Sequence, residues 1–136
     1  MNIETGHFSR DLGAALGVVP VEGSEAEQCA ALAQAVVDLY RSGSTAAFPG
    51  AFAVVERYVI FGNDDEQRLV IVGFLESLKN LSVWTDLDYA VFEEWILPET
   101  YQAWRWLEKH WQGKRSLASA AEGTSDRLYI PPKKEV

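Results

Sequence analysis

The sequence is poor in the residues that build metal centres and disulfides. It holds a single cysteine, Cys29, and two histidines, His7 and His110, which lie far apart along 136 residues. One cysteine cannot form an internal disulfide, which favours a reducing, cytoplasmic setting. No HxxxH, CxxC or HExxH spacing occurs, and the acidic run at 63–66 is not a calcium loop. We therefore expect neither a metal nor a cofactor.

Long apolar runs and catalytic motifs are also missing. No apolar stretch approaches the roughly 18–20 residues of a membrane span, and the first residues lack the basic and then apolar order of a signal peptide. No GxSxG, Walker or GxGxxG motif appears. The adjacent acid pairs Asp64–Asp65 and Glu93–Glu94 would point about 100° apart on a helix, so they do not share a proton by default. We expect no enzyme and no membrane contact.

Basic residues are scarce in most of the chain. Residues 1–99 contain 16 acidic and 5 basic side chains, against 4 and 7 in residues 100–136, and the formal net charge is −8. An acidic body repels phosphate backbones, which argues against nucleic-acid binding. Such a body suits a basic protein partner, because opposite fields speed encounter. Solubility alone is the simpler reading of the same charge.

What the sequence does contain is helical periodicity. Residues 24–43 open with a capping box, Ser24 and Glu27, carry an apolar stripe and end at Gly43. A weaker pattern predicts one short helix within HFSRDLGAALGVV, ended either by Gly17 or by the VVPVEG turn that follows. Residues 49–61 are β-branched enough to read as a strand, but the caps and glycine stops around them favour a helix, with Ser44 or Thr45 as its cap.

The stretch NDDEQRLVIVGFLESLKNL, residues 63–81, predicts the central helix. Asn63 and Glu66 have the spacing of a capping box, and three acids fall in the first turn, where the helix dipole favours them. Gly73 is costly in a helix interior, and close approach of another helix would explain it. Asp86 or Asp88 then caps a further helix that holds residues 89–96. Pro98 begins the last helix, which Gly113 closes.

Five tryptophans fall between positions 84 and 111, together with several acids. Most of these rings belong in a core, but aromatic anchors ringed by acids also suit a surface that binds a basic partner. From charge and aromatic content alone, we predict these partner-binding residues: Asp64, Asp65, Glu66, Trp84, Asp86, Asp88, Glu93, Glu94 and Trp106.

Two segments resemble a known family. GNDDEQ followed by LVIVGFLESLKNL, and the later LPETYQAWRWLEKHWQGK, are similar to the central helix and closing segment of small bacterial immunity proteins encoded beside polymorphic toxins, including those of Rhs type. The resemblance covers roughly residues 56–114. It implies a cytoplasmic, mainly helical protein that binds a cognate toxin domain and blocks it. It carries no toxin-contact motif over to this chain.

These observations predict an all-α, single-domain bundle of about five or six helices over residues 1–113, packed around the 63–81 helix. An irregular tail, residues 114–136, is expected to be partly ordered or docked. The expected function is that of an immunity protein. The alternative is an adaptor or chaperone that recognises the targeting segment of a secreted effector. A third reading, an enzyme that uses paired carboxylates, has the least support.

Overall fold

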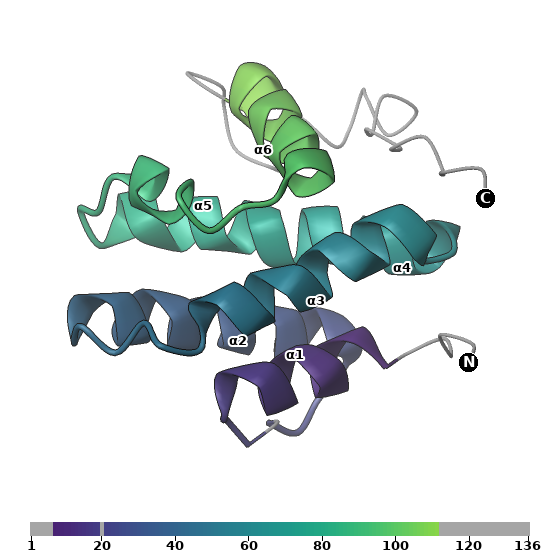
Figure 1. Cartoon of the computed structure of the whole chain (residues 1–136), viewed down its shortest axis with the longest axis horizontal. Helices are drawn as coiled ribbons and strands as arrows, with labels where there is room; N and C mark the ends of the chain where they lie inside the picture. The colour runs from purple at the N-terminus through teal and green to yellow at the C-terminus, as the bar shows by residue number, and fades with distance from the viewer. Residues whose placement is uncertain (1–6, 20, 112–136) are drawn as a thin grey trace.

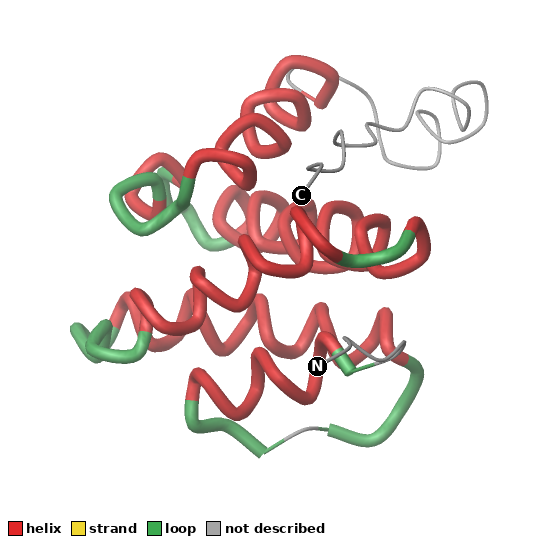
Figure 2. The backbone as a smooth tube through the Cα atoms, turned by 45° about the vertical axis from the view of Figure 1, so that its right-hand side comes forward, coloured by secondary structure: helices red, strands yellow, loops and turns green. Residues whose placement is uncertain are grey.

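All regular structure in residues 7–19 and 21–111, the part of the chain that this computed structural model describes, is helical (Figures 1 and 2). The elements are α1 (Phe8–Leu16), α2 (Glu25–Arg41), α3 (Phe48–Phe61), α4 (Asp64–Arg68), the π-helix η1 (Leu69–Leu75), α5 (Glu76–Trp84), the 3₁₀-helix η2 (Tyr89–Phe92) and α6 (Pro98–Trp111). The all-α prediction is confirmed. The predicted tail, 114–136, and Gly113 lie outside the described residues.

The elements α4, η1 and α5 follow one another without a break, and we call residues 64–84 the central helix. It packs against α2, while α1 bridges α2 and α3. The last helix, α6, crosses α3 and η1 from the other side, so it lies at one end of the stack and α1 at the other (Figure 1). The sequence places this helix at 63–81, and it in fact runs through Trp84.

Helix ends follow the predicted chemistry at several places. Both capping boxes form: Ser24 accepts from the amide of Glu27, and Asn63 accepts from that of Glu66, with each glutamate reaching back to the cap. Gly17 ends α1 in the left-handed conformation. Gly43, with φ of 79°, closes α2 in the same way.

Two local predictions are wrong. The helix α3 begins at Phe48 with Ala47 as its N-cap and no side-chain cap bond, so neither Ser44 nor Thr45 caps it. The predicted helix over 89–96 is a short 3₁₀ turn, with Asp88 as its cap, and the bonds that follow it are also of the i to i+3 type. A 3₁₀ turn brings side chains three apart onto one side, and Tyr89, Phe92 and Trp95 all meet aromatic rings of other helices.

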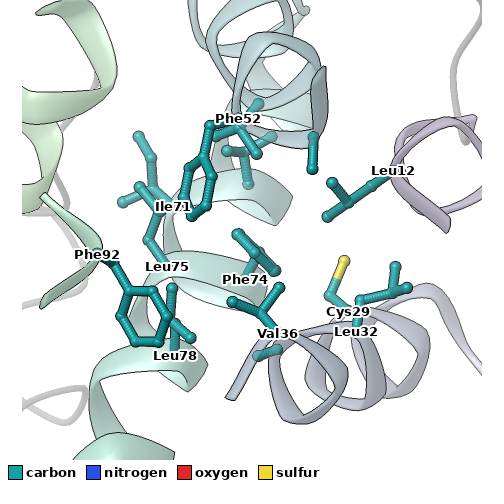
Figure 3. Packing of buried hydrophobic residues seen from close by; sticks show 14 of the residues in the cluster. Leu12, Cys29, Leu32, Val36, Phe52, Ile71, Phe74, Leu75, Leu78 and Phe92 are labelled. Atoms are coloured by element: carbon teal, nitrogen blue, oxygen red, sulfur yellow. The ribbon is translucent and has the colours of Figure 1, made fainter. Parts of the chain in front are cut away.

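The core lies where α1, α2, α3 and the central helix meet. Figure 3 shows side chains from these helices and from η2 converging on Phe74. At Gly73 the central helix lies against α2: a Cβ added there would lie 3.5 Å from the Cβ of Cys29, which is an ordinary contact distance. The tighter contact, 3.2 Å, would be with Leu69 of the same helix, so the approach of α2 does not by itself require glycine here. A hydrogen bond from the buried Tyr58 hydroxyl to Asp11, 2.5 Å long, ties α3 to α1.

The helix α6 is held at its start by a side chain from α3. Glu56 accepts hydrogen bonds from the backbone amides of Glu99 and Thr100, at 3.1 and 2.8 Å, and from the Thr100 hydroxyl at 2.7 Å. Pro98 begins the helix as predicted. Glu56 therefore acts as an N-cap supplied from another helix, where a carboxylate also complements the helix dipole. Within the described ranges no helix is both long and apolar enough to cross a bilayer.

Candidate protein-binding surface

The central helix separates the predicted contact residues into two groups. Asp64 and Asp65 are exposed in its first turn, whereas Trp84 is its last residue, and Asp86 and Asp88 follow it. At about 1.5 Å per residue, the span from Asp64 to Trp84 is roughly 30 Å. Figure 1 shows α4 and α5 at opposite ends of this helix. The acids that look alike in the sequence therefore form two separate patches.

The acids at the N-terminal end have a structural explanation. Asp64 and Asp65 lie in the first turn, where the positive end of the helix dipole favours negative charge. Glu66 departs from the expectation that it contacts a partner. Only 3% of it is exposed, and its Oε1 accepts from the Asn63 amide at 2.9 Å. Because capping holds this carboxylate inside the protein, Glu66 is not part of the surface.

The C-terminal end of the central helix exposes apolar side chains. Trp84 is 84% exposed and its neighbour Val83 is 52% exposed. The adjacent Asp86 and Asp88 are exposed as well. We call these four residues the Trp84 surface. A tryptophan that leaves most of its indole in water gains little from folding, and large rings of this kind are common anchors in protein interfaces.

The backbone at Asp86 takes a conformation that glycine usually supplies. Asp86 has φ of 63° and is the one described residue other than glycine with a positive φ. Its amide donates to the Val83 carbonyl at 3.1 Å, and the Leu87 amide donates to the Ser82 carbonyl at 2.7 Å. These two bonds form a Schellman motif in which aspartate stands at the position where glycine is most frequent. Aspartate tolerates this conformation better than most residues, but at some cost.

The Trp84 surface also carries negative charge where a helix disfavours it. Carbonyl groups give the C-terminal end of a helix a partial negative charge, and nearby carboxylates add to it. Arg41 of α2 offsets part of this charge by donating to the Thr85 carbonyl. The Asp88 carboxylate accepts from the Ala90 amide at 3.0 Å and caps η2. The surface therefore combines an exposed indole with a concentrated negative potential, which a cationic side chain would relieve.

The remaining predicted contact residues lie on the elements after the central helix. Glu94 is exposed just beyond η2, whereas Glu93 accepts a 3.0 Å hydrogen bond from the Trp104 indole. Trp106 is partly buried on α6 and stacks on the imidazole of His110, with ring centroids 4.3 Å apart. Glu93 and Trp106 are thus engaged within the protein. Glu94 is the member of this group that remains open to solvent.

Sequence reasoning missed a buried lysine beneath this region. Lys79 of α5 is fully buried, and its Nζ lies 3.6 Å from the centroid of the Tyr89 ring and 3.8 Å from that of Trp104. The signal was present, because position 79 follows the apolar residues Ile71 and Leu75 at four-residue steps along the buried side of the helix. A lysine on a buried stripe contrasts with the usual exposed location of lysine.

Burial controls the ionisation of two groups in the interior. It lowers the pKa of Lys79 to about 8, with Arg105 acting in the same direction and Glu108 and Glu93 opposing it. Burial, followed by the charge of Glu25, raises the pKa of the Cys29 thiol to about 12, so the reactive thiolate does not form near neutral pH. In the parts of the chain that the structure describes, no three histidine, cysteine or acidic side chains gather as a metal site.

Comparison with known proteins gives a family without an assigned activity. No curated protein and no solved structure matches the chain. The family model of a domain of unknown function, DUF7674, matches residues 18–112. The match spans α2 to α6 and so contains the Trp84 surface and Lys79, while α1 lies before it. Since the match covers well over half of the sequence, the chain belongs to the DUF7674 family.

Proposed function

We propose that this protein is an immunity protein that binds a cognate bacterial toxin domain through the Trp84 surface and so neutralises it. One observation carries the proposal: Trp84 is 84% exposed beside two carboxylates at the negative end of a helix. The indole gains little from folding while it is exposed, and the charge of Asp86 is unfavourable at this end of the helix; a partner that covers the indole and brings positive charge improves both.

Charge defines the kind of partner. Toxin domains that act on nucleic acids or nucleotides line their active sites with lysine and arginine, because these side chains bind phosphate. A protein with a net charge of −8 attracts such a surface over long range, which raises the association rate. Occlusion of the basic site by Trp84, Asp86 and Asp88 would exclude the substrate. The resemblance to immunity proteins and the proposed cytoplasmic location agree with this role.

Burial and position support a smaller set of contact residues than charge alone. Trp84 is the apolar anchor, Asp86 and Asp88 are the charged contacts, and Val83 and Glu94 lie at the margin. Asp64 and Asp65 lie at the far end of the central helix, where the helix itself accounts for their charge. They therefore serve as controls for effects of net charge.

The proposal is tested by co-expression with the toxin domain encoded beside the gene. Wild-type protein should restore growth, and Trp84→Ala should weaken binding by about 30-fold or more, because truncation of a central tryptophan commonly costs about 2 kcal/mol. Phe61→Ala is the matched control, since Phe61 is also an exposed aromatic side chain, at 58%, and lies at the other end of the molecule.

Two outcomes would count against this function. Cells that make the wild-type protein and still die from the toxin would exclude neutralisation. Binding to a targeting segment of the effector, with the toxic domain left active, would instead identify the adaptor or chaperone. Equal losses for Trp84→Ala and Phe61→Ala would leave neutralisation intact but remove Trp84 as the anchor.

A further inference from the structure

The ammonium group of Lys79 is enclosed by three elements. Lys79 itself belongs to α5, and the rings of Tyr89 from η2 and Trp104 from α6 cover its Nζ at 3.6 and 3.8 Å. The two rings meet edge to face, with centroids 5.7 Å apart. Within the described residues this Nζ donates no hydrogen bond. Its contacts are therefore the faces of two aromatic rings, which attract a cation through their quadrupoles.

A buried ammonium without a hydrogen-bond acceptor is costly, and an apolar side chain would fill the same space without that cost. The charged groups that face it are Glu93 beyond η2 and both Glu108 and Arg105 of α6. The acids favour the ammonium and the guanidinium opposes it. The presence of a lysine here calls for a role that an apolar residue cannot fill.

The segment that carries the carboxylates of the Trp84 surface is anchored at two points. At one end, the Leu87 amide donates to the Ser82 carbonyl of α5 at 2.7 Å. At the other end, the Tyr89 ring lies on the ammonium of Lys79. Asp86 precedes the first anchor by one residue, and Asp88 directly precedes the second. Asp86 and Asp88 thus lie on either side of Leu87, in a segment that is held by the Schellman bonds at one end and by Tyr89 at the other.

The second ring connects this segment to α6. Trp104 covers the other side of the ammonium, and its indole nitrogen donates to Glu93 at 3.0 Å. Glu93 directly follows η2. Residues 86–93 are therefore linked to α5 and α6 at both ends of η2: Tyr89 lies on the Lys79 ammonium, and Glu93 is bonded to Trp104, which covers the same ammonium.

We propose that Lys79 is a positioning residue: its ammonium, held between Tyr89 and Trp104, fixes residues 86–93 against the central helix and so sets the direction of Asp86 and Asp88. The link to partner binding rests on the proposed function. The link to the conformation of the segment does not, and it can be measured on the free protein.

The first measurement is hydrogen exchange followed by NMR on the free, full-length protein. The amides of Leu87 and Ala90 report on the segment, because they donate to Ser82 and to the Asp88 carboxylate. The Glu66 amide, bonded to Asn63, reports on the far end of the helix. Lys79→Met should speed exchange at the segment amides by about tenfold, with the Glu66 amide unchanged, and Lys79→Arg should restore much of the protection.

A second pair of variants tests the same contact from the other side. Tyr89→Leu removes the ring and should speed exchange as Lys79→Met does, whereas Tyr89→Phe keeps the ring and should not. The Trp104 indole NH resonance provides a pH profile. It should shift near pH 8 in the wild type, where the pKa of Lys79 lies, and this step should be missing in Lys79→Met.

Binding to the toxin domain encoded beside the gene separates the two proposals. If the wild type binds, Lys79→Met should weaken binding by about tenfold, and Lys79→Arg by less. Unchanged exchange of Leu87 and Ala90 in both Lys79→Met and Tyr89→Leu would overturn the positioning role. Failure of the wild type to bind would overturn the proposed function instead, and the exchange data would still decide the role of Lys79.

Discussion

Asp86 has a backbone conformation that its side chain does not favour. Its φ of 63° belongs to the region that glycine enters most easily, and it completes a Schellman motif at the end of α5. Its carboxylate also lies at the end of a helix that disfavours negative charge. Local stability would favour glycine, and the proposed basic partner would explain the aspartate.

Asp86→Gly should therefore stabilise the free protein. We expect the free energy of unfolding to rise by about 0.5–1 kcal/mol, because both the left-handed strain and the charge are removed. Asp86→Asn is the matched control: asparagine tolerates the same backbone and removes the charge alone, so a smaller gain is expected. Urea unfolding measures both. A loss of stability in Asp86→Gly would show that the carboxylate supports the fold.

Lys79 makes stability depend on pH. Its pKa is about 8 in the folded protein and 10.5 in an ordinary environment. Between these values the unfolded chain binds more protons than the folded protein, so the free energy of unfolding rises with pH. We expect a rise of up to about 2 kcal/mol between pH 8 and pH 10, since each pKa unit is worth about 1.4 kcal/mol.

Urea unfolding from pH 7.5 to 10 measures this rise, and Lys79→Met should show a flatter profile. The range stops at pH 10 because burial raises the pKa values of Tyr58 and Tyr89, whose hydroxyl groups reverse the trend at higher pH. If the free energy of unfolding depended on pH in the same way in the wild type and in Lys79→Met, burial would not destabilise the charged form of Lys79.

At the scale of elements, the sequence indicates where helices begin and end better than it indicates whether a helix is of the α, π or 3₁₀ type. The two capping boxes and the glycines at 17 and 43 are local signals, and the structure contains all of them. The π-helix over Leu69–Leu75 has no such signal, because its seven residues keep ordinary apolar periodicity. The 3₁₀ turn at Tyr89–Phe92 was missed for a related reason. The positions of its aromatic rings are set by contacts with helices that are distant in the sequence, and no local pattern shows these contacts.

The start of α6 depends on a contact that no local pattern reveals. Glu56, from α3, accepts three hydrogen bonds there. Glu56→Ala leaves those donors without a partner and should lower the free energy of unfolding by about 1–3 kcal/mol. Glu56→Gln keeps one acceptor oxygen and should cost less. Thermal unfolding would compare them, and equal stability of Glu56→Ala and the wild type would exclude the cap.

At the scale of the whole molecule, the sequence identified the acids but not their grouping. The stretch 63–66 and the acids at 86 and 88 look equivalent as charge, yet the central helix places them at its two ends. Burial then removes Glu66, and a hydrogen bond from Trp104 engages Glu93. Which carboxylates remain available is decided by helix length and packing between distant segments, and composition does not encode either.

The central claim is that the negative end of the central helix, and not negative charge in general, recognises a basic toxin domain. Two double variants change the net charge equally: Asp86→Lys with Asp88→Lys, and Asp64→Lys with Asp65→Lys. The most direct measurement is the affinity of each for the toxin domain encoded beside the gene. The account predicts a loss of about 100-fold or more for the pair at 86 and 88, and at most about threefold for the pair at 64 and 65. Equal losses for the two pairs, or a greater loss at 64 and 65, would contradict it.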